Sequence, residues 1–106
     1  MDKKSALDSL HRFRLALESK GIHIHKLVLY GSYAQGKARE GSDIDVIVIS
    51  DDFSGKSFWE RIEVLSDAIY EVFEPIEAVA LTKEEWERGE SVVVDYAKKG
   101  EVIFAS

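Results

Sequence analysis

Apolar and polar positions alternate along the chain in blocks that predict its secondary structure. Over residues 4–20, apolar side chains recur every three or four positions, which predicts an amphipathic helix that ends near Gly21. Two short apolar runs, 26–30 and 43–50, are bounded by glycine- and aspartate-rich turns and predict strands. The second run is unbroken over 46–49, as expected of a central strand that is covered on both faces.

A second amphipathic helix is predicted over residues 56–74. Apolar residues at spacings of three and four are expected to form its core-facing stripe, namely Phe58, Ile62, Leu65, Ile69 and Phe73. Pro75 is the only proline, and it is expected to end this helix because it disfavours helical geometry in the residue before it. A third strand is predicted over 76–81.

Short helices are predicted between and after these elements, over 32–38, 83–88 and 91–99. The second of them has the clearest start signal, because Thr82 is followed three positions later by Glu85, the spacing of a capping box. A last strand at the edge of the sheet is predicted over 101–105. This order of elements favours an α+β fold in which a small mixed sheet carries helices mainly on one side.

Composition bounds the domain count and excludes several function classes. At 106 residues and 45% apolar content, the chain is expected to form one domain, 1–106, with a modest core. The formal net charge of −6 argues against an extended nucleic-acid surface, which is usually basic. No apolar run approaches the roughly 18–20 residues that cross a bilayer. With no secretory signal and no cysteine, a cytoplasmic location is expected.

The densest chemistry lies between the first two predicted strands. Gly31 and Ser32 follow the first strand, where glycine allows close backbone approach and the hydroxyl is suited to phosphate oxygens. Asp43 and Asp45 open the second strand and are two positions apart, so they are expected to share a face. Two neighbouring carboxylates repel each other unless a cation lies between them. The pattern therefore predicts a site for Mg²⁺ and a nucleoside triphosphate.

This stretch resembles the polymerase-beta-type nucleotidyltransferase superfamily. The resemblance rests on Gly31-Ser32, the ten residues after them, and Asp43-Ile44-Asp45, with Gly36 and Ser42 also fitting the pattern. The short chain narrows it to the minimal nucleotidyltransferases, antitoxins that are often paired with HEPN-domain toxins. The resemblance implies the nucleotidyltransferase fold and two Mg²⁺ ions held by Asp43 and Asp45, with Gly31 and Ser32 at the phosphates.

A third carboxylate is needed for the transfer that this resemblance implies. The family has an aspartate on the neighbouring strand, and the candidate here is Glu77 in the predicted strand 76–81. The extra methylene of glutamate displaces the carboxylate by roughly 1–1.5 Å, a misplacement that can cost about 10²-fold in rate. Glu77 is thus either a metal ligand and base or an edge-strand charge that faces water.

Three further residues of the loop are candidates for nucleotide binding. Lys37 and Arg39 could neutralise phosphate oxygens, although a lone loop cation is usually solvated. Ser42 could cap the turn before the aspartates or contact phosphate. Gly36 is expected to shape the loop.

The resemblance predicts a Mg²⁺-dependent nucleotidyltransferase that transfers AMP from ATP to a hydroxyl, plausibly on a HEPN-domain toxin. The chain is too short to grip an acceptor alone, so a hetero- or homo-oligomer is expected. Trp59, Trp86 and Tyr96 are expected in the core or at an interface, and the apolar run 92–94 with Tyr96 is a candidate partner surface. The alternative is an inactive module of the same fold that neutralises its partner by contact, which the Glu77 departure favours.

Overall fold

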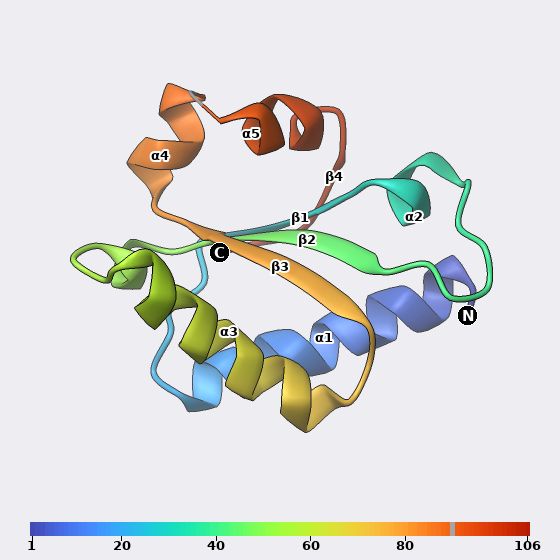
Figure 1. The fold of residues 1–106 in the computed structure, drawn as a ribbon, viewed down its shortest axis with the longest axis horizontal. Helices are drawn as coiled ribbons and strands as arrows, with labels where there is room; N and C mark the ends of the chain where they lie inside the picture. Colours follow the sequence, from blue (N-terminus) through green and yellow to red (C-terminus); the bar gives the residue numbers. More distant parts are fainter. Residues whose placement is uncertain (90) are drawn as a thin grey trace.

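The computed structural model describes residues 1–89 and 91–106, and its elements follow the predicted order (Figure 1). They are α1 (Lys3–Ser19), β1 (Lys26–Tyr30), α2 (Ser32–Gln35), β2 (Ile44–Ile49), the 3₁₀ turn η1 (Asp51–Phe53), α3 (Phe58–Val72), β3 (Ile76–Leu81), α4 (Lys83–Arg88), α5 (Val92–Ala97) and β4 (Glu101–Ala105). Strands β1, β3 and β4 have the predicted bounds. The predicted helices 32–38 and 91–99 are shorter at their ends.

The strands form one mixed sheet in the order β3-β2-β1-β4. Strand β1 pairs antiparallel with both β2 and β4, whereas β2 and β3 run parallel. The parallel pair is joined by α3, the crossover helix that parallel neighbours require. The predicted mixed sheet is confirmed, and β3 and β4 are its edges.

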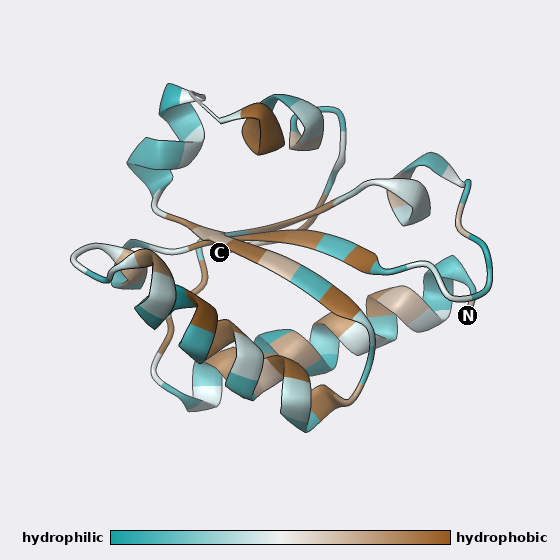
Figure 2. Ribbon diagram, in the orientation of Figure 1, coloured by the Kyte–Doolittle hydropathy of each residue, from teal (hydrophilic) through white to brown (hydrophobic). Residues whose placement is uncertain are grey.

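The two long helices, α1 and α3, lie together on one face of the sheet, and the short helices α4 and α5 lie on the other (Figure 1). The larger core fills the space between the long helices and the sheet, with Phe13, Leu17 and Leu65 among its buried residues. A smaller core includes Val28 and Ile47 on the face of α5. Figure 2 shows the start of α5 as strongly hydrophobic and α4 as largely hydrophilic.

The stripe predicted for α3 is wrong at both ends. The buried residues of this helix are Leu65, Ala68 and Val72, whereas Phe58 is 68% exposed and Phe73 is 85% exposed. The helix carries more apolar residues than its contact with α1 and the sheet can cover. Spacing alone cannot separate the buried apolar residues from the exposed ones, because both sets repeat every three or four positions.

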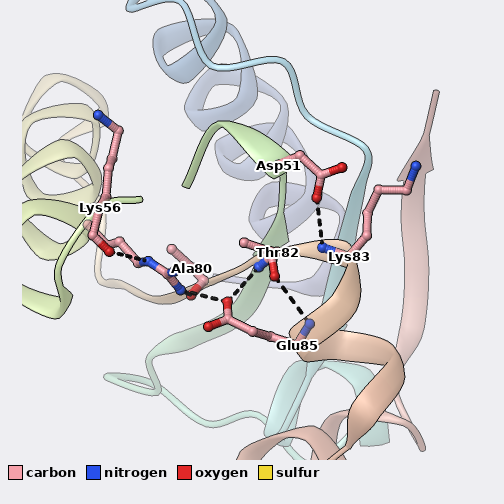
Figure 3. A network of polar contacts seen from close by, with 7 residues as sticks. Asp51, Lys56, Ala80, Thr82, Lys83 and Glu85 are labelled. Atoms are coloured by element: carbon pink, nitrogen blue, oxygen red, sulfur yellow. Dashed lines mark hydrogen bonds and ion pairs between the residues drawn. The ribbon is translucent and has the colours of Figure 1, made fainter. Parts of the chain in front are cut away.

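Side-chain caps fix the N-termini of α3 and α4, the helices before and after β3. The predicted capping box of Thr82 and Glu85 is confirmed, and a second one, Ser57 with Glu60, begins α3. Glu85 also accepts a hydrogen bond from Arg61 Nη1 at 2.7 Å, which connects α4 to α3 across the edge of the sheet (Figure 3). Within the described residues, no helix combines the length and the apolar character needed to span a bilayer.

Candidate active site

Strand register brings the second aspartate of the motif beside the predicted third carboxylate. Asp45 in β2 is the Cα partner of Glu77 in the parallel strand β3 and of Tyr30 in the antiparallel strand β1. Paired positions of neighbouring strands put their side chains on the same face of the sheet. Asp45, Glu77 and Tyr30 therefore form one row across three strands, on the face that α5 covers.

Gly31 closes one side of this row. Its backbone has φ 73° and ψ −151°, a conformation that is essentially restricted to glycine. A Cβ added there would lie 2.3 Å from Asp45 Oδ2. The Asp45 carboxylate therefore lies directly against the Gly31 backbone, immediately before α2 begins at Ser32. No side chain caps the start of α2, and Ser32 is half-buried.

The electrostatics of the row show crowded negative charge. Burial, the charge of Glu77, a hydrogen bond shared with Glu77 and the charge of Asp43 together raise the pKa of Asp45 to about 6. Burial and the charges of Asp45 and Glu77 also raise the pKa of Tyr30. No ion pair within the described part of the chain includes Asp43, Asp45 or Glu77.

Carboxylate oxygens are the donor type that Mg²⁺ prefers, so the chemistry of these residues fits the metal implied by the fold. Within residues 1–89 and 91–106, no three or more His, Cys, Asp or Glu side chains form a group arranged to hold an ion. Asp43 is exposed just before β2, and Glu77 is exposed on the edge strand. Metal ligation by Asp43, Asp45 and Glu77 therefore stays a prediction.

Among the described residues, the side-chain hydrogen bonds and ion pairs of the three loop candidates do not include the carboxylate row. The Ser42 hydroxyl accepts a hydrogen bond from the Arg39 backbone N–H at 2.9 Å, so Ser42 caps the turn before β2. Lys37 and Arg39 are exposed, and neither takes part in an ion pair of the described residues. A role in phosphate binding for Lys37, Arg39 or Ser42 remains a prediction.

The sequence did not predict the aromatic wall that Tyr30 and Tyr96 form at the β1 end of the row. The rings of Tyr30 and Tyr96 meet edge to face with centroids 6.0 Å apart. The turn from α5 into β4 fits tightly against β1, because a Cβ at Gly100 would lie 2.3 Å from the Leu29 carbonyl oxygen and 3.0 Å from Tyr30 Cβ. Tyr96 is 54% exposed, so the wall is open to solvent. The sequence signal was the apolar start of α5, which gave no indication of which strand it would face.

The fold and the carboxylate row are those expected of a nucleotidyltransferase, and sequence comparison shows this class. A family model described as "Nucleotidyltransferase domain" matches residues 10–103, and the chain belongs to this family. A curated relative from Methanocaldococcus jannaschii, named "Putative protein adenylyltransferase", is 35% identical over 72 residues. That match covers 67% of this chain and 48% of the relative, so the chain spans about half the length of the protein that it matches.

Three crystal structures share the fold at low sequence identity. One is described as a putative nucleotidyltransferase from Sulfolobus solfataricus, with a TM-score of 0.62 and 19% identity over 95% of this chain and 87% of that chain. Another is described as a toxin–antitoxin with AMP-PNP, with a TM-score of 0.61 and 21% identity over 89% and 72%. The third is a mutant of the toxin–antitoxin MntA-HpeT, with a TM-score of 0.62 and 17% identity over 91% and 73%. These likenesses confirm the predicted fold.

Proposed function

We propose that this chain is a Mg²⁺-dependent nucleotidyltransferase that transfers AMP from ATP to a hydroxyl group. The observation that carries the proposal is the convergence of Asp45, Glu77 and the Gly31 backbone, three segments far apart in sequence, on one point of the sheet. The raised pKa of Asp45 supports it, because carboxylates with perturbed pKa values cluster at functional sites.

Each residue of the site has an assigned part in this proposal. Asp43, Asp45 and Glu77 would hold two Mg²⁺ ions, which when bound supply positive charge to the transferring phosphoryl group. Gly31 lets the triphosphate approach the backbone, and Ser32 offers it a hydroxyl donor. Glu77 orients the acceptor hydroxyl and takes its proton. The acceptor oxygen then bonds to the α-phosphorus, and pyrophosphate leaves.

The partner is proposed to be a HEPN-domain toxin, with this chain as its antitoxin. Two of the structures that share this fold are described as toxin–antitoxin assemblies, and the M. jannaschii relative is named as a protein adenylyltransferase. Transfer of AMP to the toxin would then neutralise it.

The second candidate is neutralisation by contact without transfer. It is favoured by Glu77, which stands where the family has an aspartate and is exposed on the edge strand β3. A catalytically inactive module would retain the fold and the partner surface, and it would need no cation at the carboxylate row.

Transfer of label from α-labelled ATP to the partner, in the presence of Mg²⁺, separates the two candidates. Asp43→Ala combined with Asp45→Ala should abolish labelling and leave partner binding intact. The matched control is Asp8→Ala combined with Glu87→Ala, which removes two exposed carboxylates elsewhere and should label normally. If the native chain transfers no label and the Asp43→Ala, Asp45→Ala variant still neutralises the partner, the enzyme hypothesis is wrong. Neutralisation by contact would then be the function.

A further inference from the structure

Helix α3 exposes a row of aromatic side chains that neither the core nor the active site uses. We call it the α3 aromatic stripe, and it consists of Phe58, Trp59, Tyr70 and Phe73, which are 68%, 74%, 81% and 85% exposed. Each aromatic side chain presents roughly 150–250 Å², so the stripe exposes on the order of 600 Å². That total, shared between the two ends of α3, is comparable to the largest contiguous apolar patch of a typical monomer, about 300–600 Å², and such patches are often functional.

Phe73 shows that the stripe is not a by-product of folding. It terminates α3 with φ 57° and ψ 48°, and within residues 1–89 and 91–106 it is the only residue other than glycine with a positive φ. Helices commonly end on a residue in this conformation, but that residue is usually glycine. A bulky side chain there is strained, and at 85% exposure Phe73 gains little packing in return. A contact outside this chain would compensate for the strain.

The surface beside the stripe is hollowed at both ends. A groove of about 490 Å³ runs between α3 and the edge strand β3, lined in part by Phe58, Ile62 and Leu65 of the helix. A second hollow, at the other end of α3, is lined by Ile69, Tyr70, Phe73, Glu74 and Pro75. Apolar hollows therefore lie towards both ends of α3, which is about 22 Å long for 15 residues, so a partner helix of similar length could reach both.

The flank of the stripe away from β3 is acidic, whereas the groove beside β3 carries Lys56 and the Arg61–Glu85 ion pair. Glu63 and Asp67 are exposed one turn from Trp59 and Tyr70 respectively, and neither has an ion-pair partner among the described residues. A second copy packed antiparallel about a two-fold axis would bring this acidic flank against itself, which is unfavourable. Lysine or arginine on the partner would pair with it. The chain itself has a net charge of −6, which also opposes self-association.

We propose that the α3 aromatic stripe is the docking surface for an amphipathic helix of a different protein, one with lysine or arginine on the flanks of its apolar face. Such a helix would also lie beside the edge strand β3, which carries Glu77. A segment of the docked partner could then reach the carboxylate row around the edge of the sheet. The inference extends the partner half of the proposed function, but docking itself does not require nucleotidyl transfer.

Two synthetic amphipathic helices test this chemistry directly. Both have the same apolar face and about 18 residues, but one has lysine and the other glutamate at its flanks. Fluorescence anisotropy of the labelled peptides should show saturable binding of the lysine peptide that weakens with salt, and at least tenfold weaker binding of the glutamate peptide. Glu63→Lys with Asp67→Lys should reverse that preference. Equal binding of both peptides, or no binding of the lysine peptide below about 1 mM, overturns the proposal.

Variants of the stripe show whether binding occurs there. Tyr70→Ser with Phe73→Ser should weaken the binding of the lysine peptide at least tenfold, as expected for central aromatic residues of an interface. Val102→Ser is the control, because this apolar residue is 52% exposed on β4, away from α3, and the variant should bind normally. ATP binding measured on the same samples should be unchanged throughout, so a failure of docking and a failure of the nucleotide site can be distinguished.

Phe73→Gly separates docking from folding. If the side chain serves a partner, glycine should relieve the strain and raise the melting temperature by about 4 °C while weakening peptide binding. A lower melting temperature would show that Phe73 serves the fold and would overturn the argument from strain. Sedimentation of the native chain provides the last test, because a dimer that Phe73→Gly dissociates would identify a second copy as the occupant.

Discussion

The carboxylate of Asp45 fills the space that any side chain at Gly31 would need, since a Cβ at Gly31 would lie 2.3 Å from Asp45 Oδ2. Real Cβ atoms do not approach so closely, so one of the two groups would have to move. The position of the Asp45 carboxylate therefore depends on the absence of a side chain at Gly31. The contact with Asp45 is by itself sufficient to require glycine at this position.

Gly31→Ala should therefore destabilise the chain more than an ordinary glycine substitution. The backbone conformation at Gly31 costs about 1–3 kcal/mol for alanine, and displacement of Asp45 adds to it, so we expect a loss of about 3 kcal/mol in urea unfolding. Gly36→Ala is the control, because its φ is also positive but nothing lies within 4 Å of the added Cβ. It should cost only about 1–2 kcal/mol. Equal losses in the two variants would contradict the close contact.

Asp45 should make the metal-free protein less stable as pH rises. Its folded pKa of about 6 exceeds the ordinary aspartate value of 3.8, so between these values the folded state binds more protons than the unfolded state. Its contribution is favourable at low pH and is lost as pH rises through about 6. Because Asp45 is half-buried and screened by solvent, we expect a loss of only about 1 kcal/mol. With EDTA present, Asp45→Asn should be the more stable protein at neutral pH and should lose that advantage near pH 4.

Mg²⁺ should reverse that penalty at neutral pH. An ion that binds the folded chain at Asp43, Asp45 and Glu77 stabilises it by mass action, about 2.7 kcal/mol at a hundredfold excess over the dissociation constant. The melting temperature of the native chain should rise with Mg²⁺, and that of Asp45→Asn should rise much less. Asp8→Asn removes an exposed carboxylate of α1, which lies on the opposite face of the sheet from α5, and should respond like the native chain. A rise of equal size in all three proteins would indicate general ionic screening and no site.

The sequence was sufficient to predict the elements because local signals and burial agreed. The unbroken run 46–49 lies in β2, which is buried on both faces, and the Thr82–Glu85 spacing formed its capping box. The register that pairs Asp45 with Glu77 could not be predicted. It depends on how the crossover helix α3 aligns β3 with β2, and no local residue pattern encodes that alignment.

Helix α3 shows the opposite outcome. Its spacing predicted a helix correctly but placed Phe58 and Phe73 in the core, because periodicity does not tell which of two apolar faces meets the sheet. That choice is made by the contact of α3 with α1, where Leu65, Ala68 and Val72 are buried. Likewise, Tyr96 could be predicted as core or interface, but its edge contact with Tyr30 depends on the turn at Gly100.

Arg61 should be the most sensitive cation for stability at the edge of the sheet. Its guanidinium donates to Glu85 Oε1 at 2.7 Å and to the backbone carbonyls of Ala80 and Lys56, each at 3.3 Å, so it ties α3, β3 and α4 together (Figure 3). Arg61→Ala should cost about 2 kcal/mol in urea unfolding, because a largely buried guanidinium loses its hydrogen bonds to two carbonyls and to the partly exposed Glu85. Arg61→Lys should recover only part, since an ammonium cannot reproduce the planar fork. Lys99→Ala removes an exposed cation and should change stability by less than about 0.5 kcal/mol.

The hydrogen bonds between Arg61 and Glu85 also determine how the stability lost in Arg61→Ala depends on pH. Burial opposes ionisation of Glu85, but its hydrogen bonds to Arg61 and Thr82 prevail and lower its pKa. A lowered folded pKa means that the contribution of Glu85 is present above the unfolded value of 4.5 and is lost as pH falls through the folded value. The difference in stability between the native chain and Arg61→Ala should therefore shrink in acid, and Glu85→Gln should shrink it at neutral pH. A difference that stays constant from neutral pH into strong acid would show that Arg61 acts through the Ala80 and Lys56 carbonyls alone.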